Sequence, residues 1–107
     1  MIQLKYKELA EHRRKVLIIQ KSCPICGRPF SKMKSRDICI DHNHKTGCIR
    51  GLLCRPCNSM EGKVHRAFVR VGLRNQNVDY IDFLIGLASY YTIEDTDFIH
   101  PKFKVRK

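Results

Sequence analysis

The chain of 107 residues contains no long hydrophobic run, and this absence excludes a membrane-spanning helix. The longest apolar stretch runs only from Val16 to Ile19, whereas a spanning helix needs about 20 residues. An apolar leader is also missing, because charged side chains interrupt the N-terminal segment from Lys5 to Lys15. We therefore expect a cytoplasmic protein in a reducing compartment, with no membrane as a partner.

Acidic residues are scarce in the first part of the chain. Residues 1–76 hold 17 Lys and Arg against 5 Asp and Glu, whereas residues 77–107 hold 4 against 5, and the formal net charge is +11. A basic excess of this size favours a polyanionic partner, most often nucleic acid. A surface that is basic only for solubility would not explain why the excess stops near residue 76.

Six cysteines are present, and four of them form two C-x-x-C pairs: Cys23 with Cys26, and Cys54 with Cys57. Two such pairs supply the four thiolates of a tetrahedral structural Zn²⁺ site, which leaves no position open for chemistry. Three disulfides are the alternative, but nothing marks the chain as secreted, and a redox motif needs a single pair on a βαβ unit. We predict that Cys39 and Cys48 are small buried hydrophobic residues rather than ligands.

The apolar and turn patterns predict a small, zinc-stabilised α+β fold. The expected elements are a helix over residues 4–20, short strands over 38–40 and 49–53, and a helix from Pro56 toward Gly62 that resumes after it to Arg70. A loop over 72–76 and a helix over 78–91 capped by Asn77 follow. The last helix has an apolar stripe and no Lys or Arg, so it covers the domain or docks on a second chain. We divide the chain into a zinc-stabilised domain at 1–76 and a helical segment with a basic tail at 77–107.

The residues that carry chemistry lie between and directly after the cysteine pairs. A strand–turn–strand–helix order places the end of the first strand opposite the first turn of the helix, which would bring Asp41 and His42 near Asn58. Carboxylate and amide oxygens suit Mg²⁺, and an imidazole beside them can take a proton from water. Glu61 and His65 follow Asn58 at helical spacing, so a continuous helix would turn all three to one side. Each of these residues, taken alone, more often has a structural role. The prediction of a catalytic site therefore rests on their combination.

The chain resembles the phage recombination endonuclease VII proteins, which are Holliday-junction resolvases of the His-Me finger (ββα-metal, HNH-like) group. The matching segments are Cys23-x-x-Cys26, Asp41-His42-x-His44, Gly47, Arg50-Gly51-Leu52-Leu53-Cys54-x-x-Cys57-Asn58, Glu61-Gly62, Gly72-Leu73, Val78-Asp79-Tyr80 and Ile99-His100-Pro101.

The resemblance implies a residue-by-residue assignment of the site. Zn²⁺ would be bound by Cys23, Cys26, Cys54 and Cys57. Asp41 and Asn58 would bind a catalytic Mg²⁺, with Mn²⁺ as a possible replacement, and His42 would be the general base. His44 and Glu61 match positions that assist catalysis. The resemblance also implies an intertwined homodimer, dimerised through residues 77–107, that acts on branched DNA in the cytoplasm of a bacterial host.

Three functions are therefore in competition. The first is a metal-dependent endonuclease that resolves four-way DNA junctions by phosphodiester hydrolysis. The second is an HNH-type nicking or structure-nonselective endonuclease with the same chemistry. The third is a noncatalytic zinc module that binds DNA, which the combination of Asp41, His42 and Asn58 disfavours because a binding module has no need of it.

Overall fold

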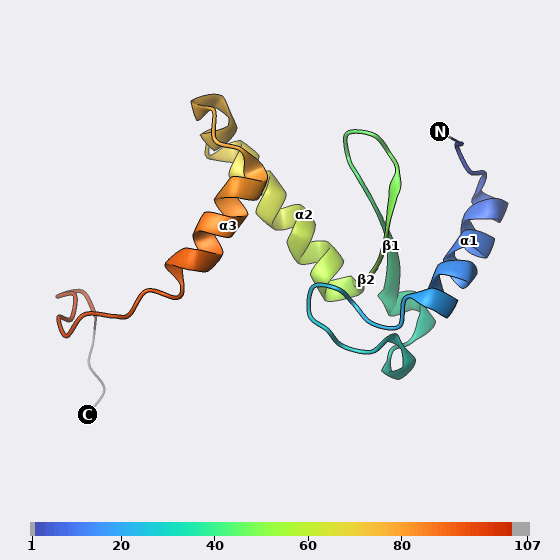
Figure 1. Cartoon of the computed structure of the whole chain (residues 1–107), viewed down its shortest axis with the longest axis horizontal. Helices are drawn as coiled ribbons and strands as arrows, with labels where there is room; N and C mark the ends of the chain where they lie inside the picture. Colours follow the sequence, from blue (N-terminus) through green and yellow to red (C-terminus); the bar gives the residue numbers. More distant parts are fainter. Residues whose placement is uncertain (1, 104–107) are drawn as a thin grey trace. The chain divides into compact units, whose positions relative to one another are not determined.

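The computed structural model describes residues 2–103, and its elements follow the predicted order (Figure 1). They are helix α1 (Tyr6–Ile19), strands β1 (Ile38–His42) and β2 (Ile49–Cys54), and helices α2 (Arg55–Arg70) and α3 (Tyr80–Tyr90), with short 3₁₀ turns between them. The small α+β class is confirmed, and α2 continues without a break through Gly62. The predicted basic tail lies largely outside the described residues, since Lys104, Arg106 and Lys107 are not among them.

The described chain divides into two compact units, and the boundary falls between Ala67 and Phe68, inside α2. The first unit contains α1, the two strands and most of α2. The second contains the end of α2, a 3₁₀ helix (Leu73–Gln76) in the segment predicted as a loop, and α3. Within residues 2–103, no helix has both the length and the apolar character needed to cross a bilayer.

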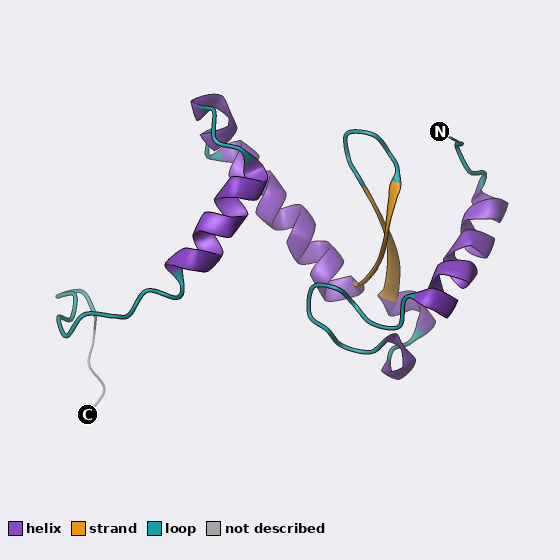
Figure 2. Cartoon of the chain, viewed as in Figure 1, coloured by secondary structure: helices purple, strands orange, loops and turns teal. Residues whose placement is uncertain are grey.

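The hairpin of β1 and β2 is the one sheet within residues 2–103 (Figure 2). Its antiparallel register pairs Asp41 with Gly51 and His42 with Ile49, so Arg50 is an extra residue on β2. This arrangement is a β-bulge, which bends a strand and redirects the side chains beside it. Gly51 follows the bulge at a φ of 145°, a conformation that side chains other than glycine rarely adopt.

The core of the first unit is small and is built around the hairpin. Its buried members are Cys23, Phe30, Ile38, Leu52, Leu53 and Cys54, and Val16 and Leu17 of α1 pack against them. Two of these core residues are cysteines of the predicted zinc site. A domain of this size buries too little apolar surface to be very stable by itself, so a metal cluster within the core would supply much of its stability.

The side chain of Gln20 joins α1 to β2 by hydrogen bonds to the backbone of one residue. The Leu52 N–H donates to Gln20 Oε1 at 2.9 Å, and Gln20 Nε2 donates to the Leu52 carbonyl at 2.6 Å. Both polar groups of Leu52 are thereby satisfied by one amide. This contact fixes the end of α1 against the buried half of the hairpin.

In the second unit, α3 begins differently from the sequence prediction. Asp79 caps α3 by accepting a hydrogen bond from the Asp82 N–H at 3.1 Å, so the predicted capping by Asn77 is wrong. Asn77 instead has a φ of 61°, a left-handed conformation that asparagine tolerates and that ends the preceding 3₁₀ helix. Phe68 is buried between the rings of Tyr80 and Phe83, with centroid distances of 5.0 and 5.3 Å.

We expect Gly51→Ala to lower the free energy of unfolding by about 1–3 kcal/mol, because the positive φ is strained for alanine. In addition, the new Cβ would lie 3.0 Å from Gln20 Oε1. The measurement is urea denaturation of the zinc-loaded protein. Gly62→Ala is the matched control, since its Cβ meets only the flexible end of Arg66 and alanine favours a helix by about 1 kcal/mol. Equal stability of both variants would contradict the strain at Gly51.

Candidate metal centre and adjoining polar site

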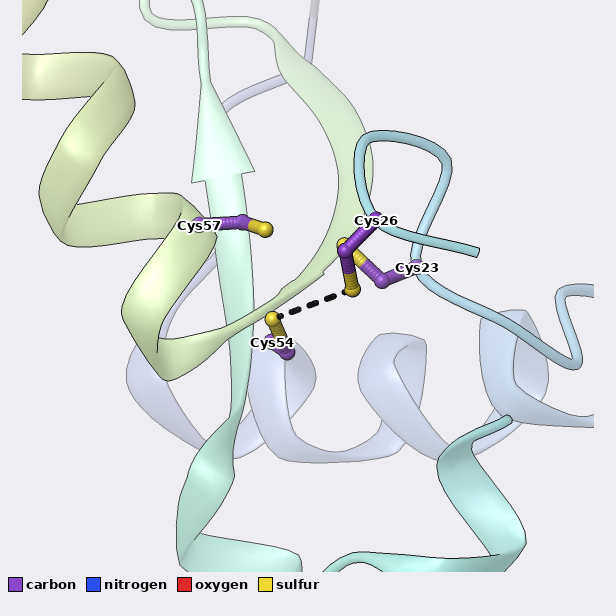
Figure 3. Close-up of side chains that lie close together, drawn as sticks. All are labelled: Cys23, Cys26, Cys54 and Cys57. Carbon is purple, nitrogen blue, oxygen red and sulfur yellow. Dashed lines mark hydrogen bonds between the residues drawn. The ribbon is translucent and has the colours of Figure 1, made fainter. Parts of the chain in front are cut away.

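Four cysteine side chains converge where the first turn after α1 meets the junction of β2 and α2 (Figure 3). Cys23 and Cys26 lie in a turn closed by the Gly27 N–H, which donates to the Cys23 carbonyl at 2.8 Å. Cys54 is the last residue of β2, and Cys57 lies in the first turn of α2. All four Sγ atoms lie within 4.8 Å of one another.

The sulfur positions fit a tetrahedral Zn²⁺ ion. A Zn–S bond of about 2.3 Å gives a tetrahedron with S–S edges of about 3.8 Å. The Cys26 and Cys54 sulfurs are 3.7 Å apart. None of the six cysteines forms a disulfide in this structure, and four of them cluster instead, so the structure does not support the disulfide alternative. These four residues could bind zinc, and a site closed by four thiolates holds structure rather than performing catalysis.

The electrostatics of the cluster are those of thiolates that need a cation. The Arg28 guanidinium donates to Cys26 Sγ at 3.3 Å and to Cys54 Sγ at 3.2 Å. These contacts lower the pKa of the Cys26 thiol to about 6. In contrast, the hydrogen bond to the Cys54 sulfur, burial and the other nearby sulfurs raise the pKa of Cys57 to about 12. One arginine therefore cannot stabilise four thiolates, whereas a coordinated Zn²⁺ deprotonates all its cysteine ligands.

The other two cysteines lie outside this cluster. Cys39 is half-buried on β1, and Cys48 is exposed. The prediction that both are buried hydrophobic residues is wrong for Cys48. The reason is local: Cys48 directly follows Gly47, which has a φ of 77°, and it belongs to the turn rather than to β2.

A second polar group forms where the hairpin meets α2. The bulge residue Arg50 makes a bidentate ion pair with Asp41, with Nε–Oδ2 at 2.8 Å and Nη2–Oδ1 at 3.1 Å. The same Nη2 donates to Glu61 Oε1 at 3.3 Å. Asp41 is 9% exposed and comes from β1, Arg50 from β2 and Glu61 from α2. One guanidinium thus joins all three elements and satisfies a buried carboxylate, and its pKa is raised by the hydrogen bonds to Asp41.

The two histidines of the Asp-His-x-His segment lie next to each other beyond this group. The ring centroids of His42 and His44 are 4.9 Å apart, and both side chains are exposed. The turn that follows is held by Asn43, whose Oδ1 accepts from the Lys45 N–H at 2.8 Å. The Asn43 backbone is also paired with that of Cys48 and Gly47. The imidazoles therefore stand in solvent at the end of β1, directly after the buried Asp41.

Asn58 and His65 are placed by α2, together with Glu61. All three are half-buried on one uninterrupted helix, as their spacing predicts. Among the described residues, no hydrogen bond joins Asn58 to Asp41 or His42, so a shared metal site for Asp41 and Asn58 stays a prediction. Arg50 forms ion pairs with both Asp41 and Glu61, and the ring of His42 lies beside the ring of His44.

Arg50 is the residue of this group to which sequence analysis assigned no role. It stands in the Arg-Gly-Leu-Leu-Cys segment that carried the family resemblance, and Gly51 beside it hints at irregular backbone. Nevertheless, the alternation of residues along β2 does not reveal a bulge. Without the bulge, Arg50 would pair with His42 across the hairpin.

The fold and the cysteine cluster define a small α+β protein with a candidate zinc site beside a bulged hairpin. A family model for recombination endonuclease VII matches residues 1–92, so the chain belongs to this family. Among curated proteins, the Gene 59 proteins of Mycobacterium phages L5 and D29 are each 53% identical to it over 36 residues. Each match covers 34% of this chain and 21% of the phage protein, so the similarity spans about a fifth of those relatives.

We expect Cys54→Ser to lose zinc and most of the folded structure, because it removes a buried ligand and core residue. Structural zinc contributes on the order of 10–16 kcal/mol in apparent binding free energy. Zinc content per chain and circular dichroism are the measurements. Cys48→Ser is the matched control and should keep both, since Cys48 lies outside the cluster. Full zinc occupancy in the Cys54 variant would contradict the assignment.

Proposed function

We propose that the protein is a metal-dependent DNA endonuclease that hydrolyses phosphodiester bonds in branched DNA, such as four-way junctions. The observation that carries this proposal is the bulged hairpin, in which Arg50 joins the Asp41 carboxylate to Glu61 of α2, with two adjacent imidazoles following directly after Asp41. Membership of the recombination endonuclease VII family and the basic net charge of +11 support DNA as the substrate.

The donor atoms fit a catalytic Mg²⁺ or Mn²⁺. Both Asp41 oxygens accept from Arg50, but each carboxylate oxygen keeps a further lone pair. Asp41 would hold the cation together with the Asn58 amide oxygen, and both are the hard ligands that Mg²⁺ prefers. When bound, the ion would stabilise negative charge on the phosphoryl and leaving oxygens.

The other roles in this proposal belong to side chains of the protein. Arg50 and Glu61 hold the Asp41 carboxylate in one orientation through charge-assisted hydrogen bonds. His42, exposed at the end of β1, is the general base that takes a proton from the attacking water onto its imidazole. The ring of His44 lies beside that of His42, with a centroid distance of 4.9 Å, and would assist catalysis from there. In this proposal the hairpin and α2 form a ββα-metal, His-Me finger core.

We further propose a homodimer formed through the helical segment 77–107, with residues 1–76 as the nuclease domain. The apolar side chains of α3 support this, because Ile81 and Ile85 are 58% and 60% exposed in the single chain. Exposed apolar residues on one helix are typical of a protein interface. Two copies would present two sites, which suits nicking of opposing strands in a junction.

A cleavage assay on the zinc-loaded protein, with and without added Mg²⁺ and with no chelator, distinguishes this proposal from its alternatives. The substrates are a labelled four-way junction, a linear duplex and a single strand. We expect cleavage that requires the cation and prefers the junction. Equal cleavage of junction and duplex would favour the nicking or nonselective endonuclease, and binding without cleavage of any substrate would favour the noncatalytic zinc module.

We expect His42→Ala to reduce the cleavage rate by about 100- to 10,000-fold, the range that general base catalysis supplies. Zinc content and DNA binding should stay near those of the unaltered protein, because His42 is exposed and lies outside the cysteine cluster. His12→Ala, on α1, is the control and should cleave normally. A His42 variant that keeps full activity would disprove the base assignment.

A further inference from the structure

The segment between the first cysteine pair and β1 presents a concentrated positive charge. We call residues 32–36 the basic loop. Its three cations, Lys32, Lys34 and Arg36, are exposed and line one hollow of about 650 Å³. Arg28 and Arg55 line the same hollow from the cysteine turn and the start of α2.

The negative groups in this hollow are already paired. Asp37, its one carboxylate, lies 3.9 Å from Arg55, and the Cys54 sulfur accepts from Arg28 at 3.2 Å. Within residues 2–103, no carboxylate lies in ion-pair distance of the three cations of the basic loop. The hollow therefore has about three positive charges with no internal partner, and they favour an anion from outside the chain.

The backbone of the basic loop is held in place although its cations are exposed. Phe30, just before the loop, is 5% exposed, and Met33 within it packs on the core. From α1, the Arg13 guanidinium donates to the Ser35 carbonyl at 2.5 Å and to the Ile38 carbonyl at 3.0 Å. Lys32 and Lys34 flank the anchored Met33, so the cations project from a fixed scaffold. Such an arrangement reduces the entropy lost on binding.

We propose that the basic loop and its hollow are a docking surface for the phosphodiester backbone of DNA. This surface shares no residue with the Asp41–Arg50–Glu61 group, and it depends on the proposed function only in taking DNA as the partner. Several cations along a short segment match the repeated charge of a DNA strand, and contacts to phosphate position a duplex without reading its sequence. The basic loop would thus hold DNA while other residues cut it.

The test measures the salt dependence of DNA binding without added Mg²⁺ or Mn²⁺, where cleavage does not occur, and without a chelator that would remove the structural Zn²⁺. The variant carries Lys32→Gln, Lys34→Gln and Arg36→Gln. The control carries Lys7→Gln, Arg14→Gln and Lys15→Gln, which remove the same charge from α1. Fluorescence anisotropy of a labelled four-way junction and a labelled duplex gives the dissociation constant at several KCl concentrations. Since each phosphate contact contributes about 0.9 to the slope of log affinity against log salt, we expect the variant to lose about two to three from it and the control almost nothing.

Two outcomes would overturn the proposal: an unchanged slope in the loop variant, or an equal loss of slope in the control. Zinc content and circular dichroism establish that each variant folds. If the triple variant does not fold, the three single variants replace it, each with an expected loss of about 0.9. Cleavage by the unaltered protein is assayed separately, so a failed docking surface is distinguishable from a failed nuclease assignment.

Discussion

The crowding of four cysteine sulfurs within 4.8 Å of one another is the constraint on which the first unit depends. Without a cation, Cys57 keeps its proton because the neighbouring sulfurs and burial disfavour its charge. The cluster joins the turn after α1 to the point where β2 becomes α2, so a bound Zn²⁺ would tie together three parts of the first unit at once. Cys23 and Cys54 are also core residues, and the core around them is small. The direction in which α2 leaves the hairpin, and therefore the position of Glu61, is set by this junction.

The polar group beside the cluster is assembled by a cation of the chain itself. Asp41 and Glu61 come from different elements, and their carboxylates would repel each other without the guanidinium of Arg50 between them. The bulge makes this possible because it takes Arg50 out of the regular pairing with β1. The two carboxylates are consequently held in place by a side chain of the protein itself. Their attachment to a two-stranded sheet and a long helix, rather than to a loop, gives the site its precision.

Much of this could be predicted from the sequence, and the failures have physical causes. The spacing of the cysteine pairs predicted their convergence, because thiolates at such spacing have few other uses in a reducing compartment. Apolar periodicity predicted the helices and the two strands. By contrast, Arg50 could not be assigned, since a bulge leaves no mark in a short strand. Asn77 and Asp79 are both good capping residues, and the hydrogen bond that Asp79 accepts from the Asp82 N–H shows that Asp79 has this role. The roles proposed for His42 and Asn58 are chemical, and neither apolar periodicity nor backbone geometry tests them.

The contact between Gln20 and Leu52 has a consequence for how this protein meets others. A sheet of two strands has two open edges, and an open edge invites pairing with a strand of another molecule, which leads to aggregation. On β2, the N–H and the carbonyl of Leu52 that point away from β1 are both hydrogen-bonded to the side-chain amide of Gln20. The amide thus makes the two hydrogen bonds that one residue of a third strand would make. The backbone groups of the buried Leu52 are therefore not available to pair with a strand of another molecule. This contact disfavours association of two hairpins along the edge of β2 at Leu52, without a third strand in the sheet.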